Sequence, residues 1–323
     1  MAFHSVLVIG GSGFIGSHII AKLALTDWRA IVPTRHFDHA KDLLLVPSMD
    51  DVIEADVHDE ATLDRLVPGN TAVINLVGIL HDPTARSGEA YGREFARAHV
   101  DLPRKIVAAC ARHGVQHYLH MSALGADKNA PSMYLRSKAD GEEAALSNPA
   151  VGVTIFRPSV VFGERDHFLN LFASLAKRFP VLPVAAADAK FQPVYVEDVA
   201  QAFVHALNEK TTIGKIYELA GPTVYTLREL VKLAGAFSGH PRPVFGLPPV
   251  LARLEAALLE HMSAQPLMSR DNLDSMKVDN VATTSMKNTL GIEPTALEEV
   301  APAYLHGDRP HEHVATMHVR APR

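Results

Sequence analysis

The stretch 6–16 constrains the fold of this chain more than any other part of the sequence. An apolar, β-branched run, Val6–Ile9, ends abruptly in glycines, and an apolar pattern with helical spacing begins directly after it. Gly10, Gly13 and Gly16 have a G-x-x-G-x-x-G spacing at this junction. Glycine allows a sharp turn and a close approach to a ligand, and a helix N-terminus offers N–H groups and a positive dipole end to phosphates. The stretch therefore predicts a strand, a turn and a helix that bind the pyrophosphate of a dinucleotide, the alternative being a tight turn without a ligand.

The first half of the chain alternates short apolar runs with helical patterns. We expect strands at 6–9, 30–33, 52–55, 72–76, 117–121 and 153–157. We expect helices at 16–25, 61–66, 98–113 and 134–147. Strands separated by helices of this length indicate βαβ units with right-handed crossovers. The predicted fold class is therefore α/β, with a Rossmann-type doubly wound parallel sheet.

Proline becomes frequent after about residue 157, and the remaining apolar pieces are short. This change predicts a smaller C-terminal substrate lobe, interleaved with the last elements of the sheet. An apolar stripe with helical spacing over 247–261 predicts a core-facing or lid helix. The boundaries that follow are a Rossmann domain over 1–157, the interleaved lobe over 158–306 and a disordered polar tail over 307–323.

The composition excludes several classes of function. A net charge of −5 over 323 residues leaves no basic excess for nucleic-acid binding. No apolar run is long enough to cross a membrane, and the first apolar run is too short for a secretory signal. The only cysteine, Cys110, lies in an apolar helical run, which suggests a buried hydrophobe rather than a catalytic thiol. No metal site is expected. We predict a cytoplasmic protein.

Arg35 favours a phosphorylated dinucleotide. Rossmann proteins that bind NAD place a carboxylate near the end of the second strand, where it accepts hydrogen bonds from the ribose hydroxyls. Here that strand continues into Thr34-Arg35-His36. A guanidinium makes paired, charge-assisted hydrogen bonds to a phosphate. We therefore expect NADP(H) in preference to NAD(H), the alternative being that Arg35 is a solvated loop residue.

Ser122, Tyr134 and Lys138 form a second constellation. Ser122 follows a predicted strand, and Tyr134 and Lys138 are four residues apart, which places them on one face of a helix. A nearby ammonium lowers the pKa of a phenol toward the working pH. A serine hydroxyl can hold the oxygen of a substrate. The three residues could therefore move a proton during hydride transfer by a nicotinamide cofactor.

These motifs together resemble the short-chain dehydrogenases/reductases of the extended or atypical kind, which are epimerase/dehydratase-like. The resemblance rests on 10–16, Ser122, Tyr134 with Lys138, 156–163 and 194–200, and it covers about residues 4 to 300. Three stretches, 75–78, 120–126 and 191–196, are most similar to the branch that holds the nucleotide-binding accessory subunit of respiratory complex I and its bacterial relatives.

The resemblance implies a tightly held NADPH, a link to ubiquinone metabolism and a set of cofactor contacts. Asp56 is placed to meet the adenine amino group, and 75–78 lies beside the cofactor. The implied cofactor-binding residues are Gly10, Gly13, Phe14, Ile15, Gly16, Arg35, Asp56, Val57, Leu76, Val77, Gly78, Lys138 and Pro158. The implied partners are a small hydrophobic substrate or respiratory-chain subunits, with a location peripheral to the inner (cytoplasmic) membrane.

The resemblance leaves the question of catalysis open. Ser122, Tyr134 and Lys138 are retained, as in an NADP-dependent oxidoreductase that acts on a hydrophobic carbonyl or quinone-like substrate. Extended members often carry Asn where this chain has His99, which weakens the expected proton relay. The alternatives are a catalytically inert nucleotide-binding accessory or assembly subunit, or a sensor of the NADP pool.

Overall fold

The computed structural model describes residues 4–86, 88–248, 250, 251, 253 and 268–306. A seven-stranded parallel sheet forms its centre, in the order β11-β6-β5-β4-β1-β2-β3. The chain therefore leaves β1 in one direction along the sheet, crosses back and continues on the other side of β1. This doubly wound order confirms the predicted fold class. The strands are β1(His4–Ile9), β2(Trp28–Thr34), β3(Met49–Glu54), β4(Ala72–Asn75), β5(His117–Met121), β6(Gly152–Pro158) and β11(Ile216–Leu219).

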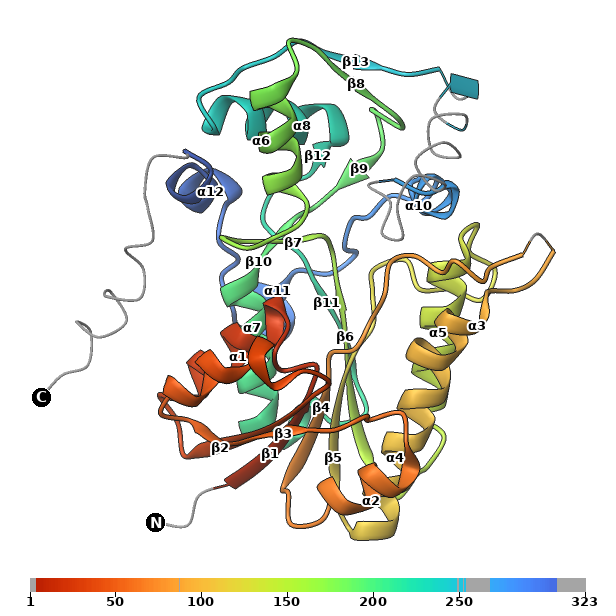
Figure 1. The fold of residues 1–323 in the computed structure, drawn as a ribbon, viewed down its shortest axis with the longest axis vertical. Helices are drawn as coiled ribbons and strands as arrows, with labels where there is room; N and C mark the ends of the chain where they lie inside the picture. The colour runs from red at the N-terminus through yellow and green to blue at the C-terminus, as the bar shows by residue number, and fades with distance from the viewer. Residues whose placement is uncertain (1–3, 87, 249, 252, 254–267, 307–323) are drawn as a thin grey trace, which may run out of the picture.

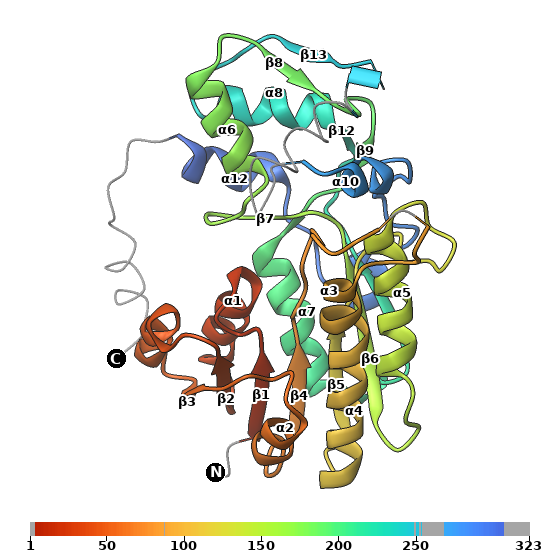
Figure 2. The same cartoon turned by 45° about the vertical axis from the view of Figure 1, so that its right-hand side comes forward.

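Helices cover both faces of this sheet (Figures 1 and 2). On one face lie α1(Phe14–Leu23), α7(Val196–Asn208) and α11(Met286–Leu290). On the other lie α2(Glu60–Leu66), α4(Leu102–His113) and α5(Met133–Ala145). The short α3(Arg93–Phe95) and a π-helix, η3(Ala96–Asp101), lead directly into α4. The 3-10 turns are η1(Phe37–His39), η2(Lys41–Leu45) and η4(Lys210–Thr212).

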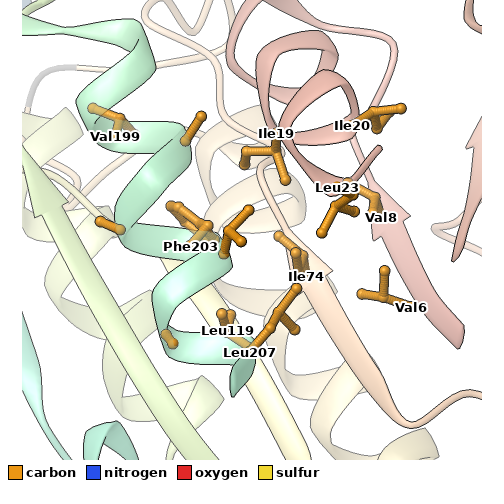
Figure 3. Packing of buried hydrophobic residues seen from close by; sticks show 14 of the residues in the cluster. Val6, Val8, Ile19, Ile20, Leu23, Ile74, Leu119, Val199, Phe203 and Leu207 are labelled. Atoms are coloured by element: carbon orange, nitrogen blue, oxygen red, sulfur yellow. The ribbon is translucent and has the colours of Figure 1, made fainter. Parts of the chain in front are cut away.

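The core on the α1 and α7 side consists of branched aliphatic and aromatic side chains (Figure 3). Phe203 of α7 packs on Phe156 of β6, with ring centroids 4.3 Å apart. Ile19 and Leu23 of α1 are fully buried in the same cluster. The core on the opposite face contains Cys110, which is fully buried, and burial raises the pKa of its thiol to about 12. This confirms the prediction that Cys110 is a buried hydrophobe.

A smaller lobe packs beyond the C-terminal ends of the strands and has a core of its own (Figure 1). Its helices are α6(Leu169–Arg178), α8(Leu227–Phe237), α10(Arg270–Ser275) and α12(Leu297–Leu305). Its short strands are β7(Val161–Phe162), β8(Leu182–Val184), β9(Lys190–Phe191), β10(Val194–Tyr195), β12(Tyr225–Thr226) and β13(Val244–Gly246). Because α7 and β11 return to the main sheet between lobe elements, the chain passes more than once between the sheet and the lobe. Most of the stripe over 247–261 and all of 307–323 lie outside the described residues.

Candidate functional site

Glycine is required at the turn between β1 and α1. Gly10 has a φ of +84°, and a Cβ there would lie 3.2 Å from the carbonyl carbon of Leu76. A Cβ on Gly16 would come within 2.5 Å of the Cα atom of Gly11, so the helix lies against the turn. Gly13 is the N-cap of α1, and no side chain caps its free N–H groups. The turn therefore presents bare backbone N–H groups at the C-terminal edge of the sheet, as pyrophosphate binding requires.

The segment after β4 lies directly beside this turn. The Leu76 N–H donates to the Ile9 carbonyl at 2.9 Å. Buried Asn75 shapes the segment, because its Oδ1 accepts from the Val77 N–H at 3.1 Å and its Nδ2 donates to the Tyr118 hydroxyl at 3.2 Å. Leu76 and Val77 thus line the point where the strand order reverses, which is where open α/β sheets bind their ligands.

Lys138 lies where three parts of the site meet: the end of β5, the helix α5 and the segment after β4. It is 4% exposed, and its Nζ donates to the Met121 carbonyl at 3.3 Å, at the end of β5. The same Nζ lies 5.9 Å from the centroid of the Tyr134 ring, one helical turn away on α5. A Cβ on Gly78 would be 3.2 Å from it. The structure therefore brings Gly78, Tyr134 and Lys138 together beside the residue that precedes Ser122.

Ser122 supplies an unsatisfied polar group at the same place. Its side chain is 3% exposed, and its Oγ has no hydrogen-bond partner among the described residues. The backbone is fixed, because the Ser122 N–H donates to the Phe156 carbonyl at 2.7 Å. A buried hydroxyl without a partner costs about 1–3 kcal/mol. An oxygen of a bound substrate would satisfy it, so this serine fits the expected ligand.

Burial shifts the pKa values of Lys138 and Tyr134. Burial lowers the pKa of the Lys138 ammonium to about 8, although Glu142 opposes the shift. Burial raises the pKa of the Tyr134 phenol above its ordinary value of 10.0. The expectation that Lys138 lowers the pKa of Tyr134 is therefore not met in this structure. Lys138 is bonded to a carbonyl rather than to the phenol, and desolvation of the ring dominates.

We expect Lys138→Met to stabilise the fold. A pKa of about 8 instead of 10.5 corresponds to about 3 kcal/mol of lost stability while the amine is protonated in both states. Between pH 8 and 10.5 the unfolded chain binds more protons at this lysine than the folded chain does. The free energy of unfolding of the wild type therefore rises over this range, and its difference from that of the variant shrinks. Urea unfolding at pH 7 and pH 10 measures this. An equal or lower stability of the variant at pH 7 would show that the buried amine is not costly.

His99 is a buried core residue that positions the Tyr134 helix. Its Nε2 accepts the Ile79 N–H at 3.0 Å, so the hydrogen-bond pattern assigns the ring proton to Nδ1. Nδ1 donates to Ser137 Oγ at 2.8 Å, and that hydroxyl donates to the Tyr134 carbonyl at 2.7 Å. Burial, followed by the charge of Lys138, lowers the His99 pKa well below its usual value. His99 is therefore neutral with both nitrogens engaged, which fixes the β4 segment to α5 and leaves no nitrogen free for a relay.

Asp271 is a residue of the site that no local sequence pattern predicts. It lies on α10, and its two carboxylate oxygens accept the Met133 and Tyr134 N–H groups at 2.6 and 3.0 Å. Ser132 caps the next amide, that of Leu135, at 3.2 Å. A carboxylate at a helix N-terminus stabilises the helix through the exposed N–H groups and the dipole. Asp271 thus joins a lobe helix to the start of the Tyr134 helix from 137 residues away.

Arg35 and Asp56 lie at the other end of the site. Arg35 is exposed just beyond β2. Opposite Thr34 in the β2–β3 register lies Glu54, whose carboxylate accepts the Phe37 N–H at 3.0 Å. Asp56 accepts the His58 N–H at 3.0 Å.

Several cations surround these residues. The guanidinium of Arg97 lies 3.6 Å from Asp56. Burial, and then the positive charges of Arg97, Lys105 and Arg35, lower the pKa of His58 despite the opposing charge of Asp56. Cations and the carboxylates of Glu54 and Asp56 therefore meet near the ends of β2 and β3.

The remaining predicted contacts lie along the same edge of the sheet. A Cβ on Gly163 would lie 3.1 Å from Phe14, so that ring packs under the loop after β7. Pro158 is the last residue of β6, and its carbonyl accepts the Leu124 N–H at 3.0 Å. Ile15 and Val57 are partly buried at the α1 turn and beyond β3. Within the described ranges, no cluster of metal-ligating side chains occurs and no helix is long and apolar enough to span a bilayer.

Comparison with known proteins places these features in a family. The model of the NAD dependent epimerase/dehydratase family matches residues 6–220. NADH dehydrogenase [ubiquinone] 1 alpha subcomplex subunit 9 of Mus musculus is 30% identical over 300 residues, 90% of this chain and 77% of that protein. The protein of the same name from Arabidopsis thaliana is 35% identical over 232 residues, 70% of this chain but only 56% of that protein. Ceramide reductase of Caulobacter vibrioides is 30% identical over 250 residues, 75% of this chain and 73% of that protein.

Solved structures agree on the fold. A UDP-glucose 4-epimerase from Bifidobacterium longum, in complex with NAD+ and UDP, superposes with a TM-score of 0.71. The superposition covers 94% of this chain and 97% of that chain at 16% identity. At this identity the superposition shows that the two chains share a fold.

Proposed function

Because the chain belongs to the NAD dependent epimerase/dehydratase family, we propose that it is an NADP(H)-dependent oxidoreductase acting on a hydrophobic carbonyl or quinone-like substrate. One observation carries this proposal, the grouping of Ser122, Tyr134 and Lys138. The buried Oγ of Ser122 has no hydrogen-bond partner among the described residues, and the carbonyl of the preceding residue, Met121, accepts a hydrogen bond from Lys138 Nζ. The same Nζ lies 5.9 Å from the centroid of the Tyr134 ring. A buried hydroxyl, a phenol and a buried cation together suit the transfer of a proton to a substrate oxygen.

The residues have distinct roles in this proposal. The glycine turn, the segment 76–78 and Lys138 would hold the cofactor, which supplies a hydride when bound. Ser122 donates a hydrogen bond to the substrate oxygen. Tyr134 gives its phenolic proton to the same oxygen and recovers a proton from solvent. Lys138, charged below about pH 8, stabilises the phenolate that remains. His99 and Asp271 position the Tyr134 helix and transfer no proton.

The preference for NADP(H) over NAD(H) rests on charge. Arg35 is exposed just beyond β2, and two further cations lie near His58, where Lys105 donates to the His58 carbonyl and Arg97 lies 3.6 Å from Asp56. A 2′-phosphate is a dianion near neutral pH, and a guanidinium binds it through two parallel hydrogen bonds. The position just beyond β2, where NAD-binding Rossmann proteins carry a carboxylate, is held by Arg35 in this chain, and the nearby Glu54 ends β3 and accepts the Phe37 N–H.

We expect Arg35→Ala to weaken NADPH binding by about 10- to 100-fold, because hydrogen bonds to charged groups contribute about 1.5–3 kcal/mol. NADH affinity is expected to change less than twofold. Titration of both nucleotides by tryptophan fluorescence or calorimetry gives the two dissociation constants. The exposed Arg65→Ala on α2 is a control for the loss of a positive charge. Equal weakening of NADPH and NADH by Arg35→Ala would argue against a phosphate contact.

The direct test of the proposed function uses the protein as purified. Mass spectrometry of the released nucleotide identifies NADP or NAD and its oxidation state. Incubation with hydrophobic ketones, aldehydes and short-chain quinones then reports turnover as a loss of nicotinamide absorbance. Release of NADH in place of NADPH would contradict the cofactor assignment, and absence of turnover across the panel would favour the second function.

The second candidate is an inert, NADP(H)-stabilised accessory subunit of the respiratory chain, and the relatives named as complex I subunits favour it. Its partners would be respiratory-chain subunits, and its place the cytoplasmic side, peripheral to the membrane. A sensor of the NADP pool is a variant of this function that needs reversible binding. In either case we propose that 1–157 binds the nucleotide and that the lobe within 158–306 receives the substrate or partner.

A further inference from the structure

The outer face of the ribbon formed by β8 and β13 is apolar and exposed among the described residues. The strands pair in parallel, with Phe245 opposite Pro183. Side chains alternate between the two faces of a strand, and because Leu182, Val184 and Val244 belong to the lobe core, Pro183 and Phe245 point outward. The exposed residues Phe179, Val181 and Pro243 flank the two strands, and we call these five residues the lobe face.

The aromatic and aliphatic members of the lobe face are well exposed. Phe179 is 51% exposed, Val181 45% and Phe245 58%. Further along the chain, Val250 is 78% and Leu251 51% exposed. Isolated exposed apolar residues are common, but a continuous apolar face marks an interaction site.

The charge around the lobe face is opposite in sign to that of the whole chain. The protein carries 36 Asp and Glu against 31 Lys and Arg. Yet the segments 177–187 and 240–253, which contain both strands, have no carboxylate and four cations, Lys177, Arg178, Arg242 and Arg253. Arg242 donates to the Ala176 carbonyl at 2.9 Å and Arg253 lies 3.8 Å from Asp274, whereas Lys177 and Arg178 are exposed at the end of α6, directly before Phe179. The first acids that follow the two segments in the sequence are Asp188, which is paired with Arg228 at 3.2 Å, and Glu255.

We infer that the lobe face docks on an anionic phospholipid bilayer. Aromatic and aliphatic side chains flanked by Lys and Arg are the pattern of proteins that lie in the interface of such a membrane. The face lies at the end of the molecule farthest from the N-terminal edge of the main sheet (Figures 1 and 2). Docking there leaves the glycine turn in water and brings the lobe to the source of a hydrophobic substrate. The inference rests on the membrane-peripheral place given to the protein under Proposed function and is independent of chemistry at Tyr134.

The test is co-sedimentation of the full chain with vesicles of phosphatidylcholine, alone or mixed with phosphatidylglycerol. We expect binding to the mixed vesicles only. Lys177→Gln/Arg178→Gln should lower the partition coefficient by about 30-fold, since each interfacial cation contributes about fivefold. Phe179→Ser/Phe245→Ser should lower it by at least about tenfold. The control Leu25→Ser, which removes a 90% exposed leucine after α1, should bind as the wild type does.

NADPH affinity measured on the same samples separates this inference from the proposed function. Lost vesicle binding with unchanged NADPH affinity supports the docking face. The inference is overturned if the wild type binds neither vesicle, if it binds both equally, or if the two double variants bind as tightly as the wild type. A concentration-dependent dimer that Phe179→Ser/Phe245→Ser abolishes, without vesicle binding, would assign the face to a second copy of the chain instead.

Discussion

Tyr134→Phe is expected to lower the turnover number for NADPH oxidation by a hydrophobic carbonyl substrate by about 10²- to 10⁴-fold, the usual contribution of a positioned general acid. The change removes one oxygen from a ring whose backbone is held by Asp271 and Ser137. Because no hydrogen bond of the Tyr134 hydroxyl occurs within the described residues, the fold should lose little. Steady-state kinetics with titration of NADPH separate lost chemistry from lost binding, and the dissociation constant for NADPH should stay within about twofold.

Tyr91→Phe is the matched control for that variant. The Tyr91 hydroxyl donates to Asp140 of the same helix at 2.7 Å, so the control makes the same chemical change against the same element. It should leave turnover unchanged. A Tyr134→Phe enzyme with wild-type turnover would exclude the phenol as the acid and favour the accessory function, in which Tyr134 only packs against His99 and Phe95.

The parts of the site that could be predicted from sequence are those encoded by short-range patterns. The glycine spacing predicted the β1–α1 turn, because a position with φ of +84° beside Leu76 favours glycine, and the alternation of apolar runs with helical patterns predicted the doubly wound sheet. The i, i+4 spacing of Tyr134 and Lys138 was sufficient to place both on one face of α5. The C-terminal ends of the six predicted strands differ from the observed ends by at most one residue, as at Met121, whereas β3 begins at Met49, three residues before its predicted start.

The parts that could not be predicted depend on long-range contacts. Asp271 reaches the Tyr134 helix from α10, and nothing in its local sequence marks it. His99 could be interpreted as a surface or a core histidine because the π-helix Ala96–Asp101 changes which residues of this segment face inward. The predicted direction of the Tyr134 pKa shift was wrong for a related reason. Burial of the ring, which is a property of the packed site, raises this pKa and opposes the charge effect expected from spacing alone.

Lys138 lowers the stability of the fold while placing a positive charge in the site. A buried ammonium whose acceptor among the described residues is one carbonyl is costly in a folded protein, and hydrophobic residues of similar size would fit the position better. Its retention beside Gly78, whose missing Cβ leaves room for it, indicates a ligand that uses the charge. A cofactor ribose or a developing phenolate would do so. Both candidate functions require a contact between Lys138 and the cofactor ribose, and only the oxidoreductase requires Lys138 to stabilise a developing phenolate.

Gly13→Asp is expected to abolish measurable NADP(H) binding while leaving the fold intact. The new carboxylate would stand at the N-cap of α1, about 4 Å from the phosphates, where like charges cost about 4 kcal/mol, or about a thousandfold in affinity. Asp is a favourable N-cap residue, and the added Cβ would lie 3.2 Å from the Gly10 carbonyl, a contact that a small shift relieves. The free energy of unfolding without nucleotide should therefore change by less than about 1 kcal/mol.

The contrast with Gly16→Ala separates cofactor binding from folding at this turn. A Cβ on Gly16 would lie 2.5 Å from both the Cα and the carbonyl oxygen of Gly11, and neither backbone atom can move without displacing α1 from the sheet. Urea unfolding should show Gly16→Ala destabilised with or without NADPH. Gly13→Asp should match the wild type without NADPH and lack the stabilisation that the ligand gives the wild type. If NADPH stabilised Gly13→Asp as much as the wild type, the pyrophosphate would not sit on the N-terminus of α1, and the interpretation of the glycine turn would fail for both candidate functions.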